Sequence, residues 1–262
     1  MKKIAFVFLV ILLAFTIVCC DSEGMKAAID SIEIVNGELV VKYSNGSSRN
    51  FGRVDLNSEG TDGLSYYPLI DGTYEVSIGA ATSEKIIVIP SSYNGIPVTK
   101  IADNGFSENK TLEQVVIPQT VTRIGYHAFG LCSNLKSIEI PNSVIELEDS
   151  AFFWCEGLES VTLSENIKEI NPLTFSGCFS LAELNIPVGT QYIGREAFAY
   201  SKIAEITIPD SVEIIDGKVF EYCVNLETVY CEAEIAPNGW SENWLYGCQA
   251  EVFYGYKGTK EE

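Results

Sequence analysis

Cysteine is the residue type with the widest chemical scope in this sequence, because it can form disulfides, bind metal ions or act as a nucleophile. Five of the eight cysteines follow one spacing, each three residues after a phenylalanine or, in the last case, after Leu245: Cys132, Cys155, Cys178, Cys223 and Cys248. Such a spacing predicts a stack of small, buried, free thiols, because stacked Cβ vectors point the same way and suit a disulfide poorly. A disulfide within the stack is the alternative. A zinc site is not expected, since there is no C-x-x-C pair.

Other candidates for catalysis or metal binding are few. His127 is the only histidine. We expect it to be exposed, and a nucleophile would have to be brought to it, whereas Cys132 is predicted to point inward. Residues 55–60 begin like a calcium-binding loop, but Tyr66 stands where a bidentate glutamate is required. The acidic run at 146–149 is interpreted as a solvated turn. The sequence therefore predicts no catalytic residue, no metal and no cofactor.

The cysteine spacing belongs to a longer internal repeat. The segments LEQVVIP, LKSIEIP, LESVTLS, LAELNIP, IAEITIP and LETVYCE begin at residues 112, 135, 158, 181, 203 and 226, so the steps are 23, 23, 23, 22 and 23 residues. One phenylalanine recurs with the same step, at Phe106, Phe129, Phe152, Phe175, Phe198 and Phe220. A unit of this length cannot bury its own apolar side, whereas stacked copies can. The repeat predicts a solenoid in which each repeat forms one coil.

Each unit predicts a short strand followed by a tight corner. Ile138 and Ile140 alternate with polar residues, which is typical of a half-buried strand. Pro141 ends that strand, because proline has no N–H for the ladder. We expect left-handed backbone at a shared position of four repeats, occupied by Gly125, Asn171, Gly194 and Asp216. Glu148 occupies the same position and does not fit that expectation.

The combined pattern L-x-x-V-x-I-P-x-x-V-x-x-I-G-x-x-A-F-x-x-C resembles the BspA-like leucine-rich repeats of bacterial surface proteins. The resemblance covers residues 84–254, and the strand, proline, glycine and phenylalanine positions coincide in one unit. It implies a right-handed, curved β-solenoid of about 23-residue units with a parallel sheet on its concave side. It further implies a cell-surface protein that adheres to host matrix or cell-surface proteins, or to other bacteria. A glycan is a further partner that we expect, and the lack of a catalytic set predicts that the chain is not an enzyme.

Binding residues are expected at the outward positions of the concave strands. These positions form columns of hydroxyl, amide and acidic side chains on a broad, rigid sheet, which is where solenoids commonly bind partners. The candidates are Ser137, Glu139, Ser160, Thr162, Glu183, Asn185, Glu205, Thr207, Thr228 and Tyr230. The alternative interpretation is that these residues are only solvated and contact no ligand.

The first residues predict export and lipid attachment. A basic start, MKK, is followed by an uncharged apolar run too short for a membrane span of about 20 residues, as in a secretory signal. The segment Ile17-Val18-Cys19-Cys20 resembles the lipobox of bacterial lipoproteins, which implies a lipid on Cys20, with Cys19 as the other candidate. We expect a chain anchored in the bacterial cell envelope and exposed at its surface. An ordinary signal or an uncleaved anchor is the alternative.

Turn signals divide the rest of the chain. Asn36-Gly37 and Asn45-Gly46 each lie between alternating apolar runs and predict a small antiparallel β-meander, and Asp71-Gly72 predicts a further hairpin that caps the solenoid. The predicted organisation is a signal peptide at 1–19, a linker at 20–29, the β-meander at 30–55, a linker at 56–63, the cap hairpin at 64–83, the solenoid at 84–254 and a polar tail at 255–262.

Charge and composition exclude some classes of function. There are 36 acidic and 17 basic residues, which gives a net charge of −19 and disfavours a nucleic-acid partner. Two functions compete with surface binding. One is a structural envelope spacer without a ligand. The other is a carbohydrate-active β-helix enzyme, which would need acidic metal ligands and a basic residue in a groove, and none of the four arginines lies in a predicted concave column.

Overall fold

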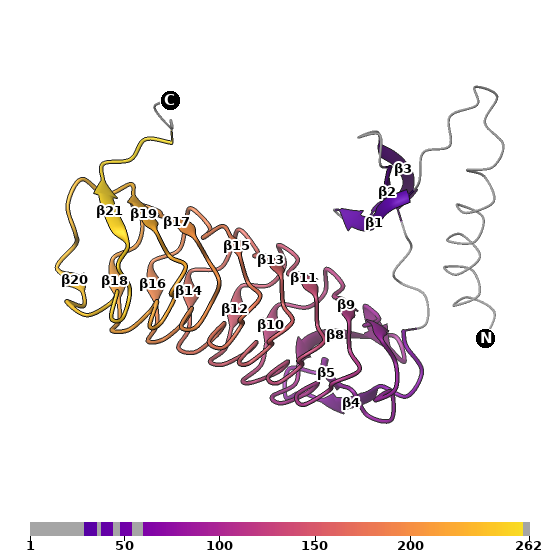
Figure 1. The fold of residues 1–262 in the computed structure, drawn as a ribbon. Helices are drawn as coiled ribbons and strands as arrows, with labels where there is room; N and C mark the ends of the chain where they lie inside the picture. The colour runs from indigo at the N-terminus through magenta and orange to yellow at the C-terminus, as the bar shows by residue number, and fades with distance from the viewer. Residues whose placement is uncertain (1–28, 36–37, 44–47, 54–59, 259–262) are drawn as a thin grey trace, which may run out of the picture. The chain divides into compact units, whose positions relative to one another are not determined.

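The computed structural model describes residues 29–35, 38–43, 48–53 and 60–258, and the chain divides into two compact units at residues 59 and 60. The first unit holds an antiparallel sheet in the order β1 (Ile29–Val35), β2 (Glu38–Tyr43) and β3 (Ser48–Arg53) (Figure 1). Cys19 and Cys20 lie outside the described residues. Among the described residues, no helix has the length and apolar character needed to cross a membrane.

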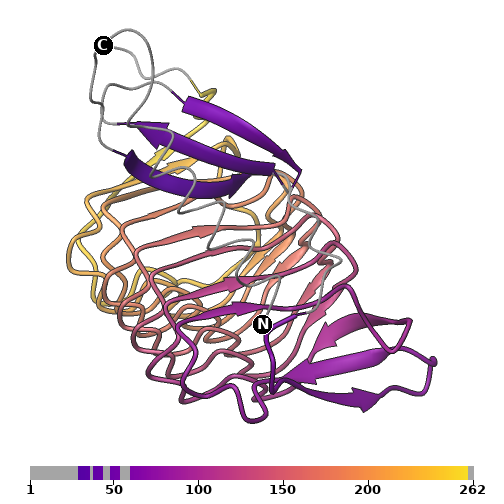
Figure 2. The same ribbon diagram turned by 90° about the vertical axis from the view of Figure 1, so that its right-hand side faces the viewer.

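The second unit is a β-solenoid in which each coil contributes one strand to each of two parallel sheets (Figures 1 and 2). The first sheet, which is the predicted binding sheet, contains β6 (Ile86–Val88), β9 (Gln114–Val116), β11 (Ser137–Glu139), β13 (Ser160–Thr162), β15 (Glu183–Leu184), β17 (Glu205–Ile208), β19 (Thr228–Cys231) and β21 (Glu251–Tyr254). The second sheet contains β8 (Ile96–Ile101), β10 (Arg123–Ile124), β12 (Glu146–Leu147), β14 (Glu169–Ile170), β16 (Tyr192–Ile193), β18 (Ile214–Ile215) and β20 (Gly239–Trp240).

The register of these sheets follows the repeat step. Ser137 pairs with Ser160, and Ser160 pairs with Glu183, so equivalent positions lie side by side. The first sheet is hydrogen-bonded as a five-stranded and a three-stranded part, and the break between β15 and β17 coincides with the 22-residue step. The predicted fold class, a leucine-rich-repeat-like solenoid with parallel sheets, is confirmed, and the residues that the structure describes contain no helix.

A hairpin covers the N-terminal end of the solenoid, and two tryptophans cover the C-terminal end. At the N-terminal end, β4 (Ser65–Pro68) and β5 (Tyr74–Ser77) form a hairpin, and β5 pairs in parallel with β8 of the second sheet. The strand β7 (Ser92–Tyr93) pairs with β8 as well. At the C-terminal end, Trp240 and Trp244 are buried, and the Trp244 ring lies 6.0 Å from the ring of Phe220. These contacts remove the end coils' apolar surface from water.

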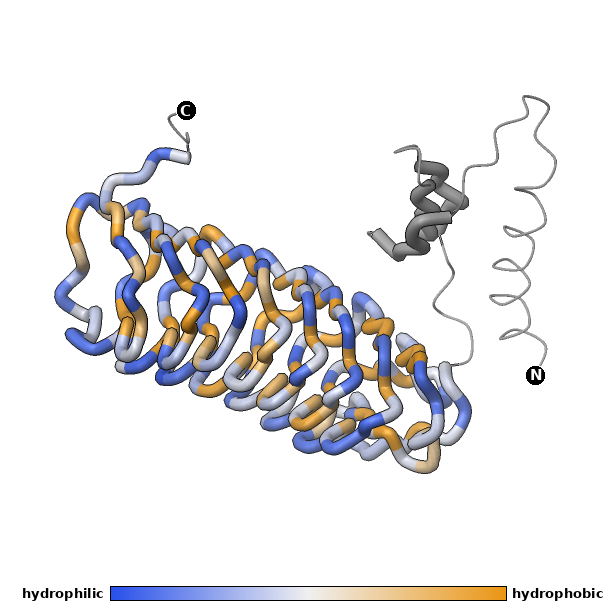
Figure 3. Tube along the Cα trace, in the orientation of Figure 1, coloured by the Kyte–Doolittle hydropathy of each residue, from blue (hydrophilic) through white to orange (hydrophobic). Residues whose placement is uncertain are grey.

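A continuous phenylalanine stack runs through the interior. Its six rings have no exposed surface, and successive centroids are 5.2 to 5.8 Å apart with interplanar angles of at most 18°. Isoleucine, leucine and valine from both sheets surround the rings, and apolar and polar segments alternate around each coil (Figure 3). Because each ring is covered by the coils on both sides, the core exists only in the stacked state.

The predicted position of the left-handed backbone is wrong by two residues. None of the four predicted residues has a positive φ. The left-handed residues instead lie two before and two after each phenylalanine, for example His127 and Leu131 around Phe129, with φ of 52° and 62°. This geometry turns their N–H groups along the solenoid axis, so that His127 donates to the carbonyl of Asp149 and Leu131 donates to that of Phe153 in the next coil.

Gly125 packs closely against the preceding coil. A Cβ at this position would lie 2.8 Å from the backbone nitrogen of Asp103 and from the carbonyl oxygen of Ile101. The Gly125 amide donates to that same carbonyl at 3.0 Å. The equivalent hydrogen bond also forms at Glu148 and Asp216, at 3.0 and 2.9 Å, so the bond itself does not depend on glycine.

Candidate binding surface

The structure brings the ten predicted binding residues onto one face of the first sheet. Ser137, Ser160 and Glu183 are in register, as are Glu139 with Thr162, Glu205 with Thr228, and Thr207 with Tyr230. Seven of the ten are exposed, and Thr207, Thr228 and Tyr230 are half-buried. Asn185 directly follows β15. The residues between them, including Ile138 and Val161, point into the core. The predicted alternation is therefore correct for this sheet.

The C-terminal end of this face is aromatic. Tyr230 stacks on Phe253 of β21 with a centroid distance of 5.9 Å, and Tyr256 lies 4.5 Å from the Tyr230 ring. Phe253 is 47% exposed and the two tyrosines are half-buried, so the cluster presents part of an aromatic surface to solvent. Sequence reasoning named only Tyr230. The alternating pattern of the last strand, AEVFYGY, would have predicted that Phe253 points outward as well.

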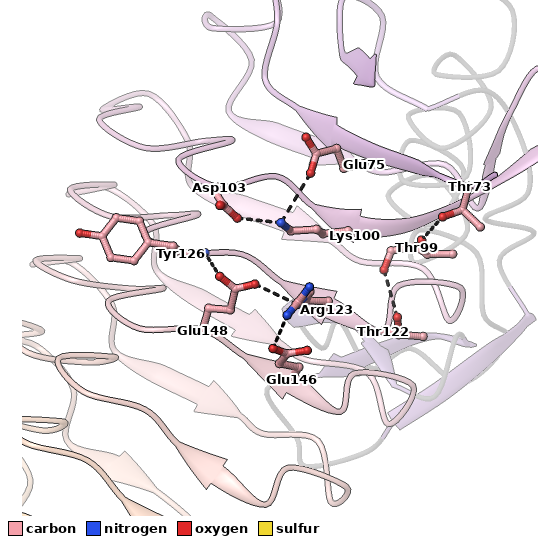
Figure 4. Close-up of polar contacts among 10 residues, drawn as sticks. All are labelled: Thr73, Glu75, Thr99, Lys100, Asp103, Thr122, Arg123, Tyr126, Glu146 and Glu148. Carbon is pink, nitrogen blue, oxygen red and sulfur yellow. Dashed lines mark hydrogen bonds and ion pairs between the residues drawn. The ribbon is translucent and has the colours of Figure 1, made fainter. Parts of the chain in front are cut away.

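A cluster of ion pairs lies on the second sheet, away from the predicted columns (Figure 4). The Nη2 atom of Arg123 lies 2.5 Å from Glu146, and its Nε atom lies 2.9 Å from Glu148. Lys100 Nζ lies 2.8 Å from Asp103. Two members of the acidic run interpreted as a solvated turn are therefore paired with Arg123.

Glu148 has a defined role at the position that did not fit the repeat. Its second carboxylate oxygen accepts the backbone N–H of Tyr126 at 3.0 Å, while its first pairs with Arg123. The side chain thus satisfies an amide of the preceding coil and a guanidinium together. A sequence pattern based on corner conformation could not reveal this contact.

The comparison with family models supports the repeat assignment. Residues 99–227 match six copies of the BspA type leucine rich repeat region. The repeat region of this chain belongs to that family. A leucine rich repeat protein of T. pallidum has a similar structure, with a TM-score of 0.61 and 26% identity over 74% of this chain and 84% of that chain.

Two further solved structures share the fold of the BspA-type solenoid. The leucine rich cell surface protein of Faecalibacterium prausnitzii has a TM-score of 0.50 and 24% identity over 68% of this chain and 56% of that chain. A leucine-rich repeat protein of Eubacterium ventriosum has a TM-score of 0.54 and 20% identity over 75% and 53%. No curated protein matches the chain.

The cysteine stack of the BspA-type solenoid consists of free thiols, as predicted. Cys132, Cys155, Cys178 and Cys223 are buried, and Cys248 is half-buried. Each Sγ lies within hydrogen-bonding distance of the phenylalanine carbonyl one coil earlier, at 2.7 to 3.3 Å. The thiols are therefore hydrogen-bond donors as well as packing groups.

Burial makes most of these thiols unreactive. It raises the pKa of Cys132 and Cys178 to about 12, so the nucleophilic thiolate is scarce at neutral pH. Cys248 differs, because its hydrogen bond with Cys223 lowers the pKa of Cys248. Cys248 is therefore the most reactive thiol of the stack, and the buried thiols are protected.

His127 is half-buried rather than exposed. Its ring lies 5.9 Å from the ring of Tyr126 and 5.7 Å from that of Phe153, and burial lowers its pKa. Within the described ranges, no group of three or more His, Cys, Asp or Glu residues is placed to hold a metal ion.

Proposed function

We propose that this chain is a lipid-anchored cell-surface protein that binds a protein or glycan, and so mediates adhesion, through the outward columns of the first sheet. The observation that carries the proposal is the register of Ser137 with Ser160 and of Glu139 with Thr162, which aligns exposed polar groups along the solenoid. Parallel strands lie about 4.8 Å apart, so these groups repeat at that interval.

The chemistry of this face suits a polar or cationic partner. Serine and threonine hydroxyls both donate and accept hydrogen bonds, and carboxylates such as Glu183 accept them. Each strand is held by its neighbours, so the face needs little rearrangement on binding. The aromatic cluster of Tyr230 and Phe253 adds a flat apolar surface at one end, which suits a sugar ring or an apolar side chain.

The proposed location rests on two supports. The segment ending at Cys20 resembles a lipobox, and the neighbour from F. prausnitzii is described as a cell surface protein. Mass spectrometry of the mature N-terminus tests the anchor. A diacylglycerol modification on Cys20 that disappears in Cys20→Ser is the expected result. An unmodified N-terminus at another residue would contradict it.

The binding face is tested by a matched pair of triple variants. Thr162→Lys, Asn185→Lys and Thr207→Lys place three long cations on the columns, and we expect at least a tenfold loss of retention on the matrix protein or glycan that retains the wild-type chain. The control places three lysines at exposed residues off the first sheet, Gln119, Gln191 and Asn238, with the same change in charge. Equal retention by both variants would contradict a site on this sheet. Absence of any retained partner in a panel would favour the spacer function.

A further inference from the structure

A row of exposed aromatic side chains runs along the loop side of the solenoid, the side that joins the second sheet to the first. This aromatic stripe contains Trp154, Phe179, Tyr200, Tyr222 and Tyr246, each from a successive coil and each 39 to 49% exposed. Neighbouring rings touch, with centroid distances of 5.5, 6.5, 5.4 and 6.3 Å. A contiguous apolar stripe of this kind on a surface is typical of an interaction site.

Three rings of the stripe occupy backbone positions that disfavour them. Trp154, Tyr200 and Tyr222 have φ of 55° to 61°, in the left-handed region that favours glycine. Glycine does occupy the equivalent positions of two other coils, at Gly177 and Gly247. The left-handed backbone at this position is common to the coils, since Glu108 and Leu131 share it, and the aromatic side chains are what set these three coils apart.

The two glycines give the rings room to lie along the solenoid. A Cβ on Gly177 would lie 2.5 Å from Cδ1 of Trp154, and a Cβ on Gly247 would lie 3.2 Å from Cδ1 of Tyr222. These rings therefore extend over the backbone of the next coil. The stripe spans four coil steps of about 4.8 Å, or about 19 Å, which matches about six residues of an extended peptide.

Charge near the stripe favours a cation. The segments that run from each corner position to the cysteine position, 148–155, 171–178, 194–201, 216–223 and 241–248, contain six acidic residues and two basic residues. Three of the acids form ion pairs within the chain, Glu148 with Arg123, Glu196 with Arg195 and Glu221 with Lys218, which leaves Asp149, Asp216 and Glu242 without a cationic partner in these segments. One of those basic residues already demonstrates the interaction. The Nζ atom of Lys218 lies 4.8 Å from the centroid of the Tyr246 ring and 2.7 Å from Glu221.

The environment of Tyr200 is also negatively charged. Partial desolvation, followed by the negative charge of Glu221, raises the pKa of its hydroxyl. An arginine or lysine arriving at Tyr200 would meet a ring face, and it would share the carboxylate of Glu221 with Lys218, which already pairs with it at 2.7 Å. Arginine fits better than lysine, because its planar guanidinium stacks on aromatic faces and is more weakly hydrated.

We propose that the aromatic stripe binds an extended, arginine-rich segment of a partner protein, by cation–π stacking on successive rings between flanking carboxylates. This surface is separate from the columns of the first sheet and is an additional interaction site. An anionic lipid surface is a poor alternative because of the surrounding negative charge. A neutral oligosaccharide is the competing ligand that the experiment must distinguish.

The test measures binding of hexa-arginine to the full chain by isothermal titration calorimetry. We expect hexa-arginine to bind more tightly than hexa-lysine, and hexaglutamate and cellohexaose not to bind. Tyr200→Gly with Tyr222→Gly should weaken hexa-arginine at least tenfold, because two ring faces are lost. Glycine suits these left-handed positions, so the fold should persist. The control, Tyr67→Ser, removes an exposed tyrosine outside the stripe.

A second double variant keeps the result decisive if the glycine variant misfolds. Tyr200→Leu with Tyr222→Leu retains apolar bulk and lacks the ring face, and it should show the same tenfold loss. Unchanged hexa-arginine affinity in a folded double variant would overturn the proposal and would leave only general attraction to an acidic surface. No binding of hexa-arginine, or tighter binding of cellohexaose, would also overturn it. Lysine substitutions on the first sheet should leave this affinity within twofold.

Discussion

Removal of one ring from the phenylalanine stack is expected to destabilise the solenoid strongly. Phe152 is fully buried, with Phe129 5.3 Å away on one side and Phe175 5.4 Å away on the other, both nearly parallel. Phe152→Ala removes the transfer free energy of a buried ring and leaves a cavity between two rigid coils. Such a change costs about 3 to 5 kcal/mol. The coils cannot collapse into the space, because the strands on both sides fix their separation, so the upper half of that range is expected.

A comparison within the stack isolates the ring–ring contribution. Phe106 is equally buried but contacts only one ring of the stack, that of Phe129 at 5.2 Å. Phe106→Ala should therefore cost less than Phe152→Ala by about 0.5 to 1.5 kcal/mol, which is the typical contribution of one aromatic pair beyond its buried area. Tyr67→Ala, at an exposed position, should change stability by less than about 0.5 kcal/mol.

Urea unfolding followed by circular dichroism measures these differences as changes in the transition midpoint multiplied by the slope. A loss of under about 1 kcal/mol for Phe152→Ala would refute the reasoning, since it would mean that the coils close over the missing ring. Equal losses at Phe106 and Phe152 would show that ring pairing adds nothing to burial.

Three further predictions concern the thiols, the ion pairs and the histidine. Among the described cysteines, Cys248 should be alkylated first by a maleimide at neutral pH, and the buried thiols should react only in urea; peptide mapping that found Cys155 labelled in the native chain would contradict the stack. Arg123→Gln should lower the free energy of unfolding by about 1 kcal/mol or less, because its ion pairs are partly exposed. High salt screens these pairs, so in thermal unfolding it should lower the stability of the wild type by this amount and leave that of the variant unchanged. Burial lowers the pKa of His127 in the folded chain, so the unfolded chain binds that proton more tightly. This contribution to stability is therefore present above about pH 6.5 and is lost as the pH falls through the lower folded value. The wild type should lose more stability on acidification than His127→Gln, and parallel pH profiles of the two chains would refute the assignment.

The repeat alone determined the main architecture. Coils of nearly equal length place residue i beside residue i + 23, so the phenylalanine stack, the free thiols and the outward columns from Ser137 to Tyr230 follow from the sequence step. Pro141 and the alternating isoleucines set where each strand ends and which side faces inward. These features depend on chain length and on local side-chain chemistry, and both are visible without a structure.

Tertiary structure decided what depends on contacts between coils. The left-handed residues lie beside each phenylalanine because their N–H groups must reach carbonyls of the next coil, a requirement that no single repeat displays. Glu148 finds Tyr126 and Arg123 in the preceding coil, and Trp154 lies over a glycine of the following one. The sequence did not reveal the aromatic stripe, because Trp154, Tyr200 and Tyr222 share one offset within their repeats whereas Phe179 and Tyr246 do not, and only the stacked coils bring the five rings together.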